Sequence, residues 1–240
     1  MNKISVKISW KSGLETFKKN WQILIYAVAV PFLVGVVMDE AFKINDMKKL
    51  VTESLYPLFG TKALYPLMLL ILYYVVKFLM QVLFNAGQTK IKLDSIEGSE
   101  TKFSDLFNSQ GVYLRLIAVT VIYSLAVLGG MILLIIPGIY IAIRYCFAST
   151  LIVDKKMGIG EAFAKSRAMT EGKMVELFLF FILSGLLVLS GLIALGVGIV
   201  VTFIIFELAF LHLYKSLLNQ SEEQVSGGQM EIEEISTLEQ

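Results

Sequence analysis

Four ionisable side chains lie within long apolar stretches of the sequence, where a charge is costly unless it is paired or functional. They are Lys77, Arg144, Glu207 and His212. Such residues can form ion pairs between membrane helices, relay protons, coordinate a metal or line a transport path. They are the candidate site residues, and the first question is which of them meet.

Arg144 and Glu207 are the pair that the sequence favours. Arg144 lies six residues after Gly138, and Glu207 lies nine residues after Gly198. At the rise of an α-helix these positions are roughly 9 and 13 Å from the outer ends of their spans. Neither charge is stable alone in hydrocarbon, so we expect an ion pair, either a structural clasp or a gating pair in a transport path. The alternative is that Arg144 extends to the outer interface.

Lys77 and His212 have simpler interpretations. The apolar stem of Lys77 lets its ammonium group reach the headgroups. His212 is the only histidine, and Glu207 lies about 140° away around the same helix, so the two do not converge on a metal. We expect a polar contact between helices for His212, with proton relay as the alternative. The single cysteine, Cys146, excludes a cysteine cage, so no metal or cofactor is expected.

Motifs of known catalytic sites are absent from the sequence. There is no HExxH, no phosphate loop and no GxSxG. An intramembrane serine protease would need a glycine two residues before its serine. The two Ser-Gly pairs, at 184–185 and 190–191, have isoleucine and valine there. We therefore expect no enzyme.

The elements that hold the candidate residues are membrane helices. The 240 residues are 56% hydrophobic and only 17% charged, less charge than a soluble domain carries. The net charge of +1 gives no reason to expect a nucleic-acid partner. About 20 apolar residues of helix cross a hydrocarbon core of about 30 Å. The pattern predicts an all-α membrane protein with six transmembrane helices: 22–38, 64–84, 112–136, 138–153, 174–195 and 198–218.

Glycine and proline predict two tight hairpin turns. Pro137 and Gly138 separate the third span from the fourth, and Gly196 and Gly198 separate the fifth from the sixth. Both turns are expected on the outer side of the membrane.

Small residues recur every four positions at the end of the fifth span. They are Ser190, Ala194 and Gly198. This spacing lets another helix approach closely. We expect packing within the chain, with an oligomer interface as the alternative.

Two short segments are predicted as amphipathic helices at the membrane surface. In the basic segment 1–21, large apolar residues from Trp10 to Trp21 recur at helical spacing. In 153–173 a second apolar stripe contains one polar residue, Ser166, and could equally contact a partner protein. The remaining segment, 219–240, has six glutamates and no cation, which predicts a disordered acidic tail.

The distribution of lysine and arginine predicts the orientation. With both termini in the cytoplasm, fourteen of the 21 basic residues lie in cytoplasmic segments and four in the one large external loop. Cytoplasmic loops of membrane proteins carry such an excess.

Sequence motifs in the second half of the chain resemble those of a known family. IIPGIY, then RY, then VDKKMGIGEAFAKSRAMTEGKMVELF resembles an Ile-Pro-Gly turn, an aromatic-rich helix, an acidic residue and a Glu-Ala…Ser…Gly-Lys…Phe segment. The earlier NAGQTKIKLDSIEGSETKFSDLF also fits. Over roughly residues 80–215, the chain is similar to prokaryotic integral-membrane proteins related to the membrane domain of glycerophosphoryl diester phosphodiesterases. The resemblance implies a multi-span domain in a prokaryotic cell (inner) membrane. It does not imply hydrolysis, because the catalytic domain of those enzymes is a separate soluble barrel.

Two functions follow as expectations. The first is a membrane-embedded accessory or scaffold protein that engages lipid or a membrane partner. The second is a small transporter or channel with a polar path near Arg144, Glu207 and His212. A transporter should have a hydrated cavity at these residues, whereas an accessory protein should have them packed dry beside an apolar groove.

Overall fold

The computed structural model describes residues 6–46, 48–49, 64–99, 112–191 and 197–238. Within these ranges the chain is helical and has no strand. The helices are α1 (Val6–Ala41), α3 (Leu64–Glu97), α4 (Tyr113–Leu133), α5 (Ile135–Arg144), α6 (Ala148–Lys155), α7 (Ile159–Thr170), α8 (Met174–Ser190) and α9 (Val197–Leu238).

The described helices include five that are long and apolar enough to cross a membrane. They are α1, α3, α4, the combined stretch Ile135–Lys155, and Gly198–Glu223 within α9. A sixth is obtained if α7 and α8, which meet at 93°, count as one broken span. The chain is therefore an all-α membrane protein with five or six spanning segments.

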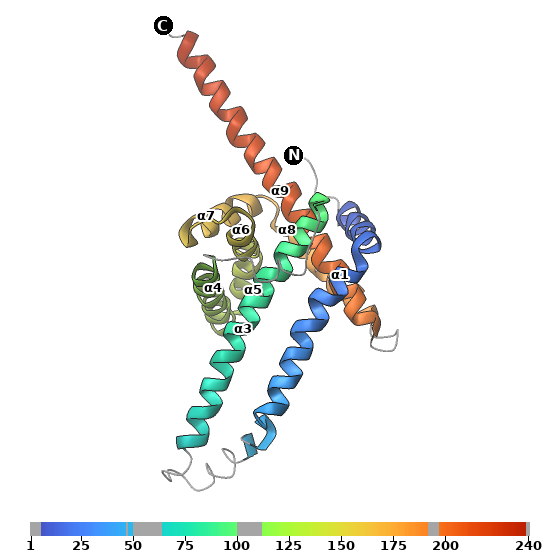
Figure 1. Ribbon diagram of the computed structural model, residues 1–240. Coiled ribbons are helices and arrows are strands. Elements are labelled where there is room, and N and C mark those ends of the chain that lie inside the picture. Colours follow the sequence, from blue (N-terminus) through green and yellow to red (C-terminus); the bar gives the residue numbers. More distant parts are fainter. Residues whose placement is uncertain (1–5, 47, 50–63, 100–111, 192–196, 239–240) are drawn as a thin grey trace.

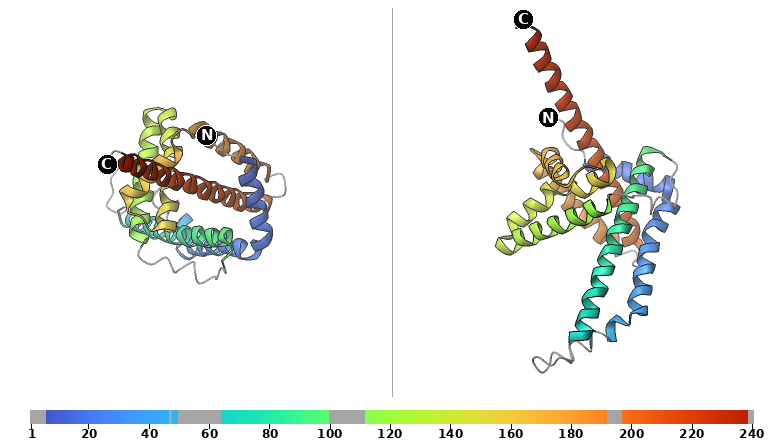
Figure 2. Two further views of the ribbon diagram at one scale, coloured as in Figure 1. Left: turned by 90° about the horizontal axis from the view of Figure 1, so that it is seen from above. Right: turned by 60° about the vertical axis from the view of Figure 1, so that its left-hand side comes forward.

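α9 is the central helix. Seen from above, it crosses the middle of the assembly (Figure 2, left), and it packs against α1, α3, α7 and α8. Its Leu208 belongs to a small core with Leu24, Ala27 and Ile91. Tyr214, on another side of the helix, belongs to the main core. Because α9 contacts these four helices, its side chains meet residues from each of them.

α1 and α3 form a long antiparallel pair that extends away from the other helices, and both termini lie at the opposite end (Figure 1). α4 and α5 form a second hairpin, which diverges from the first (Figure 2, right). The divergence leaves many large apolar side chains of both hairpins exposed, among them Phe32, Ile71 and Ile132. Lipid is the solvent that such surfaces require.

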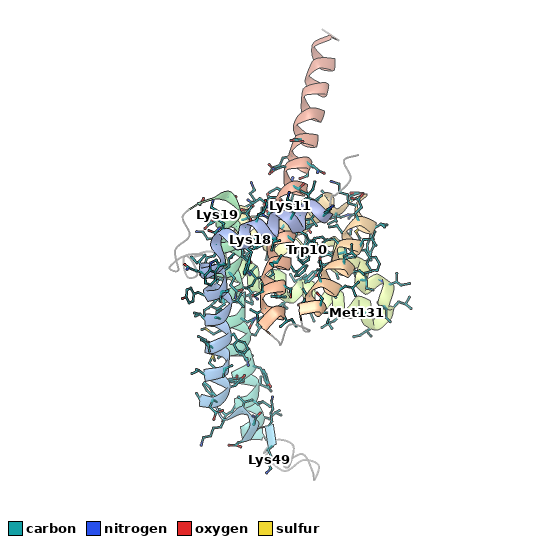
Figure 3. The ribbon with its side chains drawn as sticks, turned by 90° about the vertical axis from the view of Figure 1, so that its right-hand side faces the viewer. Trp10, Lys11, Lys18, Lys19, Lys49 and Met131 are labelled. Carbon is teal, nitrogen blue, oxygen red and sulfur yellow. The ribbon has the colours of Figure 1, made fainter. Side chains whose placement is uncertain are left out.

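The N-terminal part of α1 is set off from the span by a break at Asn20, whose φ and ψ are −121° and 21°. This part lies across one end of the molecule and carries Trp10, Lys11, Lys18 and Lys19, whereas Lys49 lies at the other end (Figure 3). The break is close to the end of the predicted segment 1–21.

The most buried residues in this first part of α1 are small, and two residues of the predicted stripe, Trp10 and Phe17, are partly buried against the cores. Ser9 and Gly13 are buried, whereas Trp21 is 49% exposed. A Cβ atom placed on Gly13 would lie 2.9 Å from the backbone nitrogen of Ala209. Glycine is therefore what allows α1 to lie directly on α9.

α3 continues well past the predicted end of the second span at residue 84. The polar composition of 85–111 predicts a loop, but the chain stays helical as far as Glu97 because the last turns of α3 are buried on two sides. Ile91 contacts the small core around Leu24, and Leu93 contacts the main core. Packing thus decides the conformation of a stretch whose composition is polar.

α9 likewise continues beyond Leu218, where the composition predicts a disordered acidic tail, and ends at Leu238. Glutamate, glutamine and methionine are good helix formers, so a helix that begins in the membrane can extend through them.

The turn between α4 and α5 lies at Leu134, whose backbone is extended (φ −162°, ψ 143°), and not at Pro137 and Gly138. Pro137 falls in the first turn of α5, where its missing N–H is not needed. Gly138 instead packs against α4, since a Cβ there would lie 2.7 Å from the nitrogen of Met131. Gly130 of α4 faces it, since a Cβ on Gly130 would lie 2.9 Å from the Cα of Gly138.

At the second predicted turn and stripe, Gly196 and Ala194 lie outside the described residues. Gly198 belongs to α9. A Cβ placed on Gly191 would lie 2.8 Å from the carbonyl oxygen of Gly198. Ser190 is exposed and donates to the carbonyl of Leu187 in its own helix. The close approach at Gly198 is therefore within the chain, and an oligomer interface stays a prediction.

Candidate functional site: an apolar cavity beside Glu207

A cavity of ≈ 580 Å³ lies between the α4–α5 hairpin and the α8–α9 pair. Ligand pockets are commonly of this size. The residues that line it come from four helices and the α5–α6 junction: Tyr123, Met131, Ile139, Ala142, Ile143, Cys146, Phe178, Phe181, Ile182, Phe206, Glu207 and Phe210. Met131, Phe178 and Ile182 are 47%, 40% and 43% exposed, so the cavity opens to the surroundings of the protein.

Aromatic rings form one wall of the cavity. The centroids of Phe181, Phe206 and Phe210 lie 6.0 to 6.5 Å from one another, within the range of favourable ring contacts. Phe206 and Phe210 are one turn apart on α9, which places both rings on the same face. This wall of the cavity is therefore apolar.

Glu207 is the one charged residue of the cavity lining. Its Oε2 accepts a 2.5 Å hydrogen bond from Nζ of Lys92, in the last part of α3. The side chain of Lys92 is only 3% exposed and also donates to Oε1 of Gln88 at 3.2 Å. Glu207 therefore forms an ion pair between α9 and α3, and not the expected pair with Arg144.

Sequence reasoning missed Lys92 because it assigned this residue to a loop. A signal was present in IKLDSI, where apolar residues flank Lys92 on both sides. Such a pattern is compatible with a helix buried on two faces, and that is its conformation here.

Arg144 lies at the end of α5, beside α7. Its Nη1 donates to the hydroxyl of Tyr140 at 2.6 Å, and its guanidinium carbon lies 5.4 Å from the centre of the same ring. Its carbonyl oxygen accepts hydrogen bonds from the hydroxyls of Ser166 (3.1 Å) and Thr170 (3.2 Å). Arg144 is thus ten residues from the Leu134 turn, farther along the span than the sequence suggested.

Ser166 has a structural explanation. The chain leaves the helical conformation between α5 and α6, which frees backbone groups. The hydroxyl of Ser166, which is fully buried, donates to the Arg144 carbonyl and accepts from the Phe147 nitrogen at 3.3 Å. The apolar stripe of α7, with Ala162 and Met169 buried, packs on the main core of the same chain. This packing accounts for the stripe without a partner protein.

Lys77 is paired within the chain, and its reach to the headgroups stays a prediction. Its Nζ lies 2.6 Å from Oδ1 of Asp39 in α1, and the same carboxylate accepts a hydrogen bond from the hydroxyl of Tyr73. The cluster joins α1, two residues before its end at Ala41, to α3.

His212 makes the expected polar contact between helices. Its Nε2 lies 3.0 Å from the hydroxyl oxygen of Thr16, in the N-terminal part of α1. Trp10, six residues nearer the N-terminus, donates from Nε1 to the hydroxyl of Ser184 at 3.2 Å. The two contacts attach this part of α1 to α9 and α8.

A second ionic cluster joins three helices at the end that holds the termini. Nζ of Lys215 lies 2.6 Å from Oε1 of Glu97 and 3.1 Å from Oδ1 of Asp154, and Tyr214 donates to the same aspartate at 2.8 Å. The cluster links α3, α6 and α9.

The structure does not bring Lys77, Arg144, Glu207 and His212 together, since each has a separate partner. Among the described residues, no group of three or more His, Cys, Asp or Glu side chains is arranged to hold a metal ion.

The fold and the cavity together define an all-α, multi-pass membrane protein with an apolar pocket that opens at the protein surface. Comparisons of the chain with protein-family models, with curated proteins and with solved structures find no match.

Proposed function

We propose that the protein is a non-enzymatic accessory membrane protein that holds a lipid in the cavity between α4–α5 and α8–α9. The observation that carries the proposal is the cavity itself, whose lining is apolar except at the Tyr123 hydroxyl, the Cys146 thiol and Glu207. The hydroxyl of Tyr123 already donates to the carbonyl of Ala142 at 2.9 Å. Such a lining favours a hydrocarbon chain over a hydrated solute.

The pairing of the charged residues supports this function over a transporter or channel. A polar path needs ionisable groups that face a common water-filled space. Here Lys77 binds Asp39, and Lys92 binds Glu207. Only Glu207, of the four predicted residues, lines the cavity.

The proposal extends to the orientation and the family. The end with both termini also carries the basic N-terminal part of α1 (Figure 3). Three of its exposed lysines, Lys7, Lys11 and Lys18, lie on one helical face and suit an anionic leaflet. We place this end in the cytoplasm of a prokaryotic cell, with the membrane as the inner membrane. The motifs around IIPGIY suggest membership of the family related to the phosphodiesterase membrane domain.

Purification of the full chain in mild detergent, followed by mass spectrometry of the bound lipids, tests the function. We expect lipid in stoichiometric amount in the wild type and its loss in Ile182→Trp, which fills the cavity. Leu186→Trp is the matched control, because Leu186 lies one turn along α8, is 60% exposed and does not line the cavity. A wild-type protein without stoichiometric lipid, or equal lipid in both variants, would contradict the proposal.

A further inference from the structure

The carboxylate of Glu207 has unused hydrogen-bonding capacity inside an apolar cavity. An ionised carboxylate has two oxygens and about four acceptor positions. Within the described part of the chain, its hydrogen bond is the one that Oε2 accepts from Lys92. The Glu207 side chain is 29% exposed and lines the cavity, whereas Lys92 is buried behind it. A charged acceptor that faces hydrocarbon is costly unless a donor reaches it.

We infer that the cavity selects a lipid with a neutral hydroxyl headgroup, such as a long-chain alcohol, whose O–H donates to the free oxygen of Glu207. The inference rests on the proposed lipid-binding function and specifies its ligand.

The charge of the site favours a hydroxyl over an amine. Lys92 and Glu207 form an ion pair with no net charge, so a cationic headgroup would bring an uncompensated charge into a low-dielectric site. A hydroxyl adds a donor and no charge.

The geometry of the lining favours a small headgroup on a hydrocarbon chain. Glu207 lies between Phe206 and Phe210 in the sequence of α9, and both rings line the cavity with it. The headgroup would therefore lie among aromatic rings, and its chain would extend along the apolar wall toward Phe178 and Ile182, where the cavity opens.

Competition binding with three matched probes tests this inference. Radiolabelled oleyl alcohol is bound to the detergent-purified full chain and displaced by unlabelled oleyl alcohol, oleyl methyl ether or oleylamine. We expect the alcohol to bind about tenfold tighter than the ether, because the ether cannot donate to the carboxylate. The amine should bind no tighter than the ether.

Lys92→Met combined with Glu207→Leu removes the acceptor without leaving a lone buried charge. In this double variant we expect the alcohol and the ether to bind equally. Size-exclusion elution at the wild-type position establishes that it is folded. A preference for the alcohol that survives in the folded double variant would overturn the assignment to Glu207.

The outcomes separate this inference from the proposed function. Equal binding of alcohol and ether to the wild type, with both lost in Ile182→Trp, would refute hydroxyl selection and leave lipid binding intact. Tightest binding of the amine would refute the neutral headgroup. Failure of all three probes to bind, together with no co-purified lipid, would refute both.

Discussion

Gly13 of α1 lies directly against the backbone of Ala209 in α9, so close that a Cβ on the glycine would come within 2.9 Å of the Ala209 nitrogen. The neighbour is backbone and cannot rotate away. We expect Gly13→Ala to lower the free energy of unfolding by about 1–3 kcal/mol, as overpacking does. Thermal unfolding in detergent measures this.

Gly35 provides the control in the same helix, since a Cβ there meets no atom within 4 Å. Gly35→Ala should leave stability unchanged or raise it by up to about 1 kcal/mol through helix propensity. Equal unfolding temperatures for the two variants would contradict the close contact.

The Lys92–Glu207 ion pair predicts a strong coupling between two substitutions. Either Lys92→Met or Glu207→Leu alone leaves a lone charge and should cost about 3–5 kcal/mol. The double variant should regain most of this loss. A double-mutant cycle on unfolding in detergent measures the coupling.

Arg144 and Glu207 serve as the comparison pair. Because Arg144 contacts Tyr140 and not Glu207, exchanging the two charges should not restore what either single substitution loses. Rescue by the exchanged pair would show that these residues do meet.

Ser166 predicts a local effect at the α5–α6 junction. Ser166→Ala removes the donor to the Arg144 carbonyl and the acceptor for the Phe147 nitrogen. We expect a loss of about 1–3 kcal/mol, because the buried Phe147 amide loses its acceptor, and faster hydrogen exchange at that amide. Ser190→Ala, at an exposed hydroxyl, should change stability by no more than about 0.5 kcal/mol. Unchanged exchange at Phe147 would refute the role of Ser166.

Trp10 can report on the attachment of the N-terminal part of α1. With Trp21→Phe, Trp10 is the only tryptophan, and its indole is half-buried against Ser184. Its emission maximum should lie at a shorter wavelength than that of Trp21, measured in the Trp10→Phe variant. Adding Gly13→Leu should shift the Trp10 emission to the red, because it separates α1 from α9. An emission unaffected by Gly13→Leu would contradict this packing.

The spanning helices could be predicted because apolar length alone determines them. The third span was expected at 112–136 and is found at Tyr113–Leu133, and α8 begins at Met174, the residue at which the fifth span was expected to begin. Where the boundaries differ, packing is the reason. The end of α3 is polar in composition, yet Ile91 and Leu93 are buried on its two sides.

The pairing of the charges could not be predicted, because it depends on which helices are neighbours. The similar depths of Arg144 and Glu207 in their predicted spans favour a pair between them. In the structure, Lys92 of α3 forms the ion pair with Glu207 instead. Ser9 and Gly13 have the same spacing of four residues as Ser190 and Ala194, so this spacing also indicates a helix-packing face near the N-terminus. The basic composition of the segment instead favours a position at the membrane surface.

The contacts of the N-terminal part of α1 impose an order on biogenesis. Thr16 meets His212, and Trp10 meets Ser184, across 196 and 174 residues of chain. The ribosome makes this segment before α8 and α9, but its binding surface exists only after those two helices have been inserted. At about 5–20 residues per second the segment waits on the order of ten seconds or more. A segment synthesised well before α8 and α9 is thus assembled only after them.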